Sequence, residues 1–216
     1  MSKNLKKRVN TSFLLVLGLY SMFMSQFLMG YFLIIIGILS ILEFSNMLSI
    51  ILKRKRILFH LLNILFNIYI FLFCISFFIL SSFTNLKSLI LIILFACVAS
   101  DLGGYIFGKI FKGPKLTKIS PNKTISGAIG SIILSILFLS VSTYFLTNIF
   151  SIYIIVIGFL ISVSSQIGDL FFSLMKRKSF KKDTGNFLPG HGGIIDRIDS
   201  MLLGIPTGLI CIAILH

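Results

Sequence analysis

Seven long apolar segments occupy most of this sequence and leave little polar chain to cover a core in water. The segments are residues 11–25, 27–49, 57–83, 88–111, 126–146, 149–175 and 194–215. A helix needs about 20 apolar residues to cross a bilayer, with a range of about 17–25, and only the first segment is short for this. Charged residues make up only 12% of the 216 residues and hydrophobic residues 56%, whereas soluble domains are about one quarter charged. The sequence therefore predicts an all-α, polytopic bundle of about seven transmembrane helices, and no polar linker divides it into more than a single domain.

Basic residues gather in four clusters, at the N-terminus and near residues 53–56, 109–123 and 176–182. Lys and Arg favour the cytoplasmic side of membrane proteins. With seven spans and a cytoplasmic N-terminus, all four clusters fall on this side, and the opposite loops, near residues 30, 82–87 and 147–148, carry only Lys87. This bias supports a break between the first two segments near residues 25–30. It also accounts for the net charge of +14, with a contribution from anionic lipid headgroups, so no nucleic-acid partner is expected.

Acidic residues are few and unevenly placed. Apart from Glu43, near the end of the second segment, they are Asp101, Asp169, Asp183, Asp196 and Asp199. At 1.5 Å per residue, Asp101 lies about 16 Å in from Lys112, and Asp169 lies about 10 Å in from Lys176. Asp196 and Asp199 begin the last segment from the same side, and their i,i+3 spacing places them on one helix face. Four carboxylates are thus expected in the cytoplasmic half of the bundle.

Carboxylates in membrane-spanning segments are costly, and they persist where they meet cations or a polar cavity. One interpretation is structural, in which these acids neutralise Arg197, Lys176 and Arg177. The other is functional, because oxygen ligands of this kind suit a hard cation such as Mg²⁺. Since four acids gather on one side beside lysines, we favour a magnesium site that serves the transfer of a nucleotide's phosphate group.

A glycine-rich stretch follows Asp101 and leads to a polar turn before the fifth segment. Gly103, Gly104 and Gly108 remove side chains where helices or a ligand approach closely. The turn offers donors just before a helix, which is a ready anion site, and its donors are Ser120, Asn122, Lys123 and Thr124. It does not contain the GxxxxGK[ST] pattern of a Walker A loop. The competing interpretation is that the glycines serve only helix packing and that the basic loop is merely solvated.

The most specific pattern of the chain runs from Ser173 to Asp199. It reads Ser-x-apolar-Lys-Arg, four residues, Lys-Asp-x-Gly, two residues, and then Leu-Pro-x-His-Gly-Gly-apolar-x-Asp-Arg-apolar-Asp. This pattern resembles the signature of the phosphatidate cytidylyltransferase family, and every specified position matches. The Ser-Pro-Asn-Lys-Thr segment at residues 120–124 resembles that family too, so that the resemblance covers about residue 100 to the C-terminus. We therefore expect residues 88–216 to form the catalytic part and residues 1–87 to carry little functional information.

The resemblance implies that CTP and phosphatidic acid are converted to CDP-diacylglycerol and pyrophosphate, a step of phospholipid biosynthesis. It also implies a magnesium-dependent site that faces the cytoplasm, in a protein of the bacterial inner membrane. Asp169 and Asp196 would be metal ligands, with Asp199 as a further candidate. A monovalent cation such as K⁺ and a homodimer are further expectations that come with the family, and membrane lipids are expected partners.

The side chains expected to act in this reaction hold phosphates or contact substrate. A phosphate oxygen of the lipid attacks the α-phosphorus of the nucleotide, and the candidates to hold the phosphates are Lys123, Lys176, Arg177 and Lys182. Because the nucleophile is already anionic, no strong general base is needed, and His191 is expected to shape its loop or to donate to a phosphate. The other candidates for substrate contact are Asp101, Ser120, Asn122, Thr124, Ser173, Asp183 and Arg197.

Two alternatives stay open at this point. A related CTP-dependent lipid kinase would share the metal site and differ in its acceptor. A membrane transporter would hold its charges near the midplane of two symmetric halves, whereas here the acids gather on one side in the second half of the chain.

Overall fold

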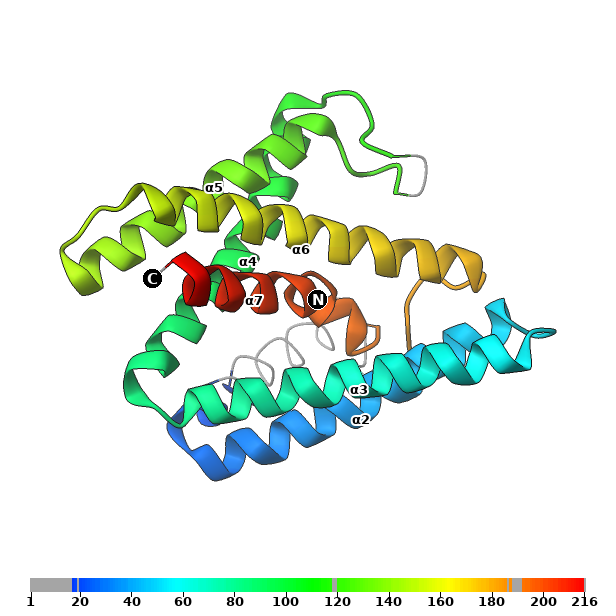
Figure 1. Cartoon of the computed structure of the whole chain (residues 1–216). Coiled ribbons are helices and arrows are strands. Elements are labelled where there is room, and N and C mark those ends of the chain that lie inside the picture. The colour runs from blue at the N-terminus through cyan, green and yellow to red at the C-terminus, as the bar shows by residue number, and fades with distance from the viewer. Residues whose placement is uncertain (1–16, 19, 118–119, 186, 188–191, 216) are drawn as a thin grey trace, which may run out of the picture. The chain divides into compact units, whose positions relative to one another are not determined.

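The structure, a computed structural model, describes residues 17–18, 20–117, 120–185, 187 and 192–215. Six long helices contain most of these residues (Figure 1), and they are α2 (Gln26–Ile51), α3 (Arg56–Ser81), α4 (Thr84–Phe111), α5 (Ile125–Thr147), α6 (Ile152–Lys178) and α7 (Ile195–Leu215). Within the described residues the extended pairing is limited to one isolated bridge, between Lys115 and Thr124. The all-α class expected from the sequence is confirmed.

All six helices are long and apolar enough to cross a membrane. Large apolar side chains also lie exposed along them, including Ile34 on α2, Phe71 on α3 and Leu137 on α5. Water-soluble proteins rarely expose apolar surface on this scale, whereas such faces suit the hydrocarbon core of a bilayer. The chain is therefore an integral membrane protein.

The helices begin and end close to the boundaries of the apolar segments. Residues 20–24 are helical and α2 begins at Gln26. Between them Ser25 is extended, with φ −135° and ψ 125°, so the helix break falls where the sequence placed it. Residues 11–16 and 19 of segment 11–25 lie outside the described residues, and a seventh span stays a prediction.

One expected loop is shorter than the sequence suggested. Residues 84–87 were expected in the loop at 82–87, but Thr84 begins α4. The physical reason is that polar residues at the end of a membrane span can begin a helix as well as form a loop, and here Thr84 and Asn85 are the first residues of α4.

Contacts divide the chain into two compact units, and both α6 and α7 run from one into the other. Unit 1 comprises residues 1–83 and 175–197, and unit 2 comprises residues 84–174 and 198–216. In unit 1, α2 and α3 run side by side (Figure 1). The ring of Phe44 on α2 stacks on that of Phe66 on α3, with ring centroids 3.8 Å apart. Whether the whole chain folds as a single domain stays a prediction.

Unit 2 is built on the extensive contact between α4 and α5. Its core includes Ile93 and Cys97 of α4 and Ile161 of α6, all of them buried. Thr124 begins α5 as its N-cap, because its hydroxyl oxygen accepts a hydrogen bond from the Gly127 amide at 3.1 Å. This cap fixes the end of the polar turn that leads into α5.

Candidate functional site

Unit 2 contains a polar cleft of about 350 Å³ where α4, the loop before α5, and α6 meet. Its walls include many of the residues that the sequence singled out as site candidates, and these are Asp101, Ser120, Asn122, Lys123, Thr124 and Asp169. Asp101 and Asp169 are separated by 68 positions in the sequence, yet both line this cleft. The structure thus brings the first glycine-rich stretch and the aspartate of α6 together.

Glycines let the backbones of α4 and α5 touch beside the cleft. A Cβ atom at Gly104 would lie 2.7 Å from Ser131 Oγ, and one at Gly127 would lie 2.7 Å from the Gly104 carbonyl oxygen. A Cβ at Gly103 would overlap the Gly130 carbonyl. These glycines therefore serve helix packing, and this packing brings Asp101 of α4 close to the start of α5.

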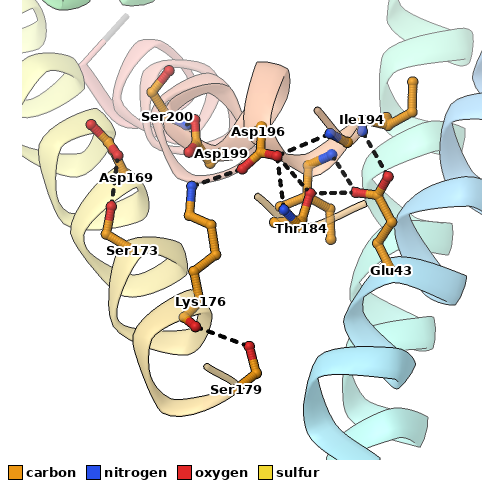
Figure 2. Close-up of polar contacts among 12 residues, drawn as sticks. Glu43, Asp169, Ser173, Lys176, Ser179, Thr184, Ile194, Asp196, Asp199 and Ser200 are labelled. Carbon is orange, nitrogen blue, oxygen red and sulfur yellow. Dashed lines mark hydrogen bonds and ion pairs between the residues drawn. The ribbon is translucent and has the colours of Figure 1, made fainter. Parts of the chain in front are cut away.

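Asp169 lies beside a lysine in the cleft. Its Oδ2 atom is 2.5 Å from Lys123 Nζ, and its Oδ1 atom accepts a hydrogen bond from the Ser173 hydroxyl at 3.3 Å (Figure 2). Ser173 lies one turn further along α6, on the same helix face as Asp169. Both members of the Lys123–Asp169 ion pair are partly exposed, which leaves them open to exchange with ligands in the cleft.

Asp101 is held by a residue that the sequence did not single out. The Ser200 hydroxyl on α7 donates to Asp101 Oδ2 at 2.7 Å. The Oδ1 atom of Asp199, the preceding residue, accepts a hydrogen bond from the Ser200 amide at 3.0 Å. Gln166, a further lining residue of the cleft that the sequence did not place there, donates to the Ala128 carbonyl at 3.2 Å. A serine and a glutamine in apolar helices gave no pattern that would have identified them.

The signature segment forms a second polar cluster, which lies in unit 1 (Figure 2). Asp196, in the first turn of α7, is its centre. Its Oδ1 atom accepts from Lys176 Nζ at 2.8 Å. Its Oδ2 atom accepts from the Thr184 amide at 2.9 Å, the Gly193 amide at 3.0 Å and the Thr184 hydroxyl at 3.0 Å. Both oxygens of this predicted site carboxylate are therefore fixed by named donors.

Glu43 belongs to the same cluster, and the sequence did not assign it any role. It lies on α2, is only 1% exposed, and accepts from the Ile194 amide at 2.8 Å and the Ile195 amide at 3.0 Å. The Thr184 hydroxyl also donates to it, at 2.7 Å. A signal existed in principle, because an acid in an otherwise apolar span is costly unless it is used.

The other predicted residues of the signature lie at the surface of unit 1 or outside the described residues. Arg177, Lys182, Asp183 and Arg197 are exposed. His191 lies outside the described residues. The expected roles of these five residues in holding phosphates or contacting substrate stay predictions.

The donor chemistry suits a magnesium ion that binds together with phosphate. In the part of the chain that the structure describes, no group of three or more His, Cys, Asp or Glu side chains is arranged to hold a metal by itself. Mg²⁺ usually binds through one or two carboxylates, with phosphate oxygens and water completing its octahedron. The carboxylate oxygens of Asp169 in unit 2 and of Asp196 in unit 1 are hard donors of the required kind, so each residue by itself fits a cation that arrives with a nucleotide.

Residues 5–215 match the model of the Cytidylyltransferase family. The phosphatidate cytidylyltransferase of Helicobacter pylori (strain J99) is 43% identical over 113 residues, which cover 52% of this chain and 42% of that protein. The Synechocystis protein of the same name is 40% identical over 123 residues, covering 55% of this chain and 41% of that protein. The Rickettsia typhi protein of that name is 34% identical over 184 residues, covering 81% of this chain and 76% of that protein.

The matches differ in how much of each relative they cover. The chain spans about two-fifths of the length of the Helicobacter and Synechocystis proteins that it matches. It spans about three-quarters of the Rickettsia typhi protein.

Proposed function

Because this chain belongs to the cytidylyltransferase family, we propose that it transfers the cytidylyl group of CTP to phosphatidic acid, giving CDP-diacylglycerol and pyrophosphate. One observation carries the proposal more than any other, namely that the pattern from Ser173 to Asp199 is complete. The names of the relatives support phosphatidate as the acceptor. The reaction would form one step of phospholipid biosynthesis.

In the proposed reaction a phosphate oxygen of phosphatidic acid forms a bond to the α-phosphorus of CTP. The bond from that phosphorus to the bridging oxygen breaks, and its electron pair leaves with pyrophosphate. The nucleophile is already an anion, so the protein need not remove a proton. Catalysis of such a step depends on positioning and on stabilising charge on the phosphate oxygens.

The cleft of unit 2 has the features that phosphate binding requires. Lys123 supplies a partly exposed ammonium group within it, and Ser120 and Asn122 supply polar groups on its wall. The N-terminus of α5, capped by Thr124, adds the favourable end of a helix dipole for an anion. We propose that Lys123 holds a phosphate group of the nucleotide, and that Lys176, Arg177 and Lys182 hold further phosphates or the leaving pyrophosphate.

We propose Mg²⁺ as the cofactor, with Asp169 and Asp196 as protein ligands and Asp199 as a further candidate. When bound, Mg²⁺ would neutralise charge on the phosphate oxygens of CTP and so favour the departure of pyrophosphate. The family also suggests a monovalent cation such as K⁺ and a homodimer, and we retain both as proposals.

The site is proposed to face the cytoplasm of a bacterial inner membrane. Lys53, Arg54 and Lys55 lie between α2 and α3, Arg56 begins α3, and further basic residues end α6. Clusters of Lys and Arg of this kind favour the cytoplasmic side. CTP would then reach the site from the compartment that contains it.

A direct assay tests the proposal. The purified chain in detergent, with Mg²⁺ and CTP, should form CDP-diacylglycerol and pyrophosphate only when phosphatidic acid is present. Diacylglycerol in place of phosphatidic acid is the matched control, because it lacks the phosphate nucleophile. Phosphorylation of diacylglycerol or of a prenol, with no product from phosphatidic acid, would refute the proposal in favour of a lipid kinase. Transport of a solute without consumption of CTP would refute it in favour of a transporter.

A further inference from the structure

Glu43 makes an unusual set of hydrogen bonds for an acid in a membrane-spanning helix. Its two carboxylate oxygens accept hydrogen bonds from the backbone amides of Ile194 and Ile195 and from the hydroxyl of Thr184 (Figure 2). These donors lie more than 140 positions away in the sequence. Helix starts are normally capped by a nearby Ser, Thr, Asp or Asn. Here the first turn of α7 is capped by a carboxylate from a different helix, α2.

Thr184 connects this carboxylate to that of Asp196. Thr184 is only 2% exposed, and its hydroxyl lies 2.7 Å from Glu43 Oε2 and 3.0 Å from Asp196 Oδ2. One hydroxyl proton is therefore shared between two carboxylates. The amide of Thr184 also donates to Asp196 Oδ2, so Thr184 holds that oxygen with two groups.

Two glycines of the signature segment lie directly against the Glu43 carboxylate. A Cβ atom at Gly185 would lie 2.6 Å from Glu43 Oε1. A Cβ at Gly193 would overlap both the Thr184 hydroxyl and the Glu43 carboxylate. The glycines at these two positions therefore let the backbone of the signature segment close directly on Glu43.

We propose that Glu43 is a positioning residue for Asp196, acting through Thr184 and through the amides that precede α7. The inference rests on the proposed function, in which Asp196 is a ligand of magnesium. Because three donors hold Oδ2, the carboxylate of Asp196 cannot turn about its side-chain bond without losing hydrogen bonds. Its other oxygen, Oδ1, therefore points toward Lys176. Groups that orient a metal ligand in this way typically change metal affinity by about 10–100-fold when they are removed.

The inference differs measurably from a purely structural role of Glu43. If Glu43 only capped α7, then its loss would lower the melting temperature and leave the magnesium requirement of the folded protein unchanged. If it positions Asp196, then the magnesium requirement rises even in protein that remains folded. Thr184 allows the sharper test, because Val has nearly the shape of Thr and removes the shared hydroxyl, whereas Ser retains it.

The experiment compares Thr184→Val, Thr184→Ser and Glu43→Gln with the unmodified chain. Thr143→Val is the control, because within the described part of the chain the Thr143 hydroxyl donates to carbonyls of its own helix alone, those of Leu139 and Ser140. Two quantities are measured over a magnesium titration with CTP, namely the initial rate with phosphatidic acid and the rise in melting temperature. The second reports binding to the folded protein without turnover.

We expect the magnesium concentration for half-maximal effect to rise about 10–100-fold in Thr184→Val and Glu43→Gln, by both measurements. Thr184→Ser and Thr143→Val should stay within about twofold of the unmodified chain. Unchanged magnesium dependence in Thr184→Val and Glu43→Gln, beside normal turnover of the unmodified chain, would overturn the positioning role alone. An unmodified chain that neither reacts nor is stabilised by magnesium and CTP would overturn the proposed function, and the inference with it.

Discussion

Replacing Asp169 by Asn tests whether this carboxylate serves chemistry or structure. Asp169 and its partner Lys123 have side chains that are 31% and 24% exposed, so water screens their attraction. Such pairs contribute about 0.2–1 kcal/mol to stability. Asn keeps the shape of the side chain and an oxygen that can accept from Ser173. We therefore expect Asp169→Asn to lose about 1 kcal/mol at most, which corresponds to a decrease of about 2–4 °C in melting temperature.

The expected effect of the same change on turnover is much larger. Asn removes the negative charge that the proposed cation requires, and loss of a single group that stabilises developing charge costs about 10²–10³-fold in rate. We expect turnover per folded molecule to fall by at least about 10²-fold. A structural carboxylate would show the reverse, with a visible loss of stability and a nearly unchanged rate.

Asp196→Asn provides the contrast, because its surroundings predict a larger loss of stability. The side chains of Lys176 and Asp196 are only 14% and 9% exposed, and two backbone amides also donate to the carboxylate. Removing one member of a buried ion pair costs about 3–5 kcal/mol. The melting temperature should thus fall by at least about 6 °C, and any loss of activity in this variant has to be corrected for the folded fraction.

Melting temperature and initial rate are measured on the same preparations across a magnesium titration, so that rate is expressed per folded molecule. The reasoning fails if Asp169→Asn retains near-normal turnover. It also fails if this variant loses as much stability as Asp196→Asn, because the exposure of the Lys123–Asp169 pair could then not explain the result.

Two further predictions concern helix packing and topology. Gly103→Ala should destabilise the protein by about 1–3 kcal/mol, since the added Cβ would overlap the backbone of α5. Gly37→Ala should be neutral or stabilising by up to about 1 kcal/mol, because its added Cβ would lie at an ordinary contact distance of 3.5 Å from Cys74 Sγ. Melting temperatures in detergent measure both, and a loss in Gly37→Ala as large as in Gly103→Ala would contradict the packing argument. Single cysteines at Lys55, Lys115 and Lys181, in a chain whose three native cysteines are replaced, should react with an impermeant reagent from the cytoplasmic side, and one at Lys87 from the opposite side. Labelling of Lys55 and Lys181 from opposite sides would contradict the proposed topology.

Much of the fold could be predicted because the apolar segments are long and sharply bounded by charge. Gln26 begins α2 one residue before the apolar segment at 27, and Phe111 ends α4 where the segment ends. The exception at Thr84 has a local cause, since polar residues near a membrane surface can either begin a helix or form a loop. Sequence polarity alone does not separate these two outcomes.

The candidate site was predictable only where its residues lie in polar stretches. Asp101, Lys123 and Asp169 interrupt or follow apolar runs, and the structure places them in one cleft. Ser200 gave no such signal, because it is an isolated polar residue whose partner lies far away in the sequence. Glu43 is an acid in an apolar span, which signals a use, but its partners also lie far away in the sequence and could not be named from it. Thr184 occupies the unspecified position of the Lys-Asp-x-Gly pattern, so its role could emerge only from the contacts of its hydroxyl.

The two aspartates proposed as metal ligands differ in how strongly their neighbours hold them, and this difference bears on how a nucleotide could bind at the proposed site. Asp196 is fixed by three groups on Oδ2 and by Lys176 on Oδ1. Asp169 is held by a screened lysine and one long hydrogen bond. Separating Lys123 from Asp169 costs about 1 kcal/mol or less, so the ammonium group would be available to a phosphate of the nucleotide and the carboxylate would be available to the proposed cation. In the proposed reaction Lys123 can thus leave Asp169 for the nucleotide at small cost, whereas Asp196 keeps its orientation throughout.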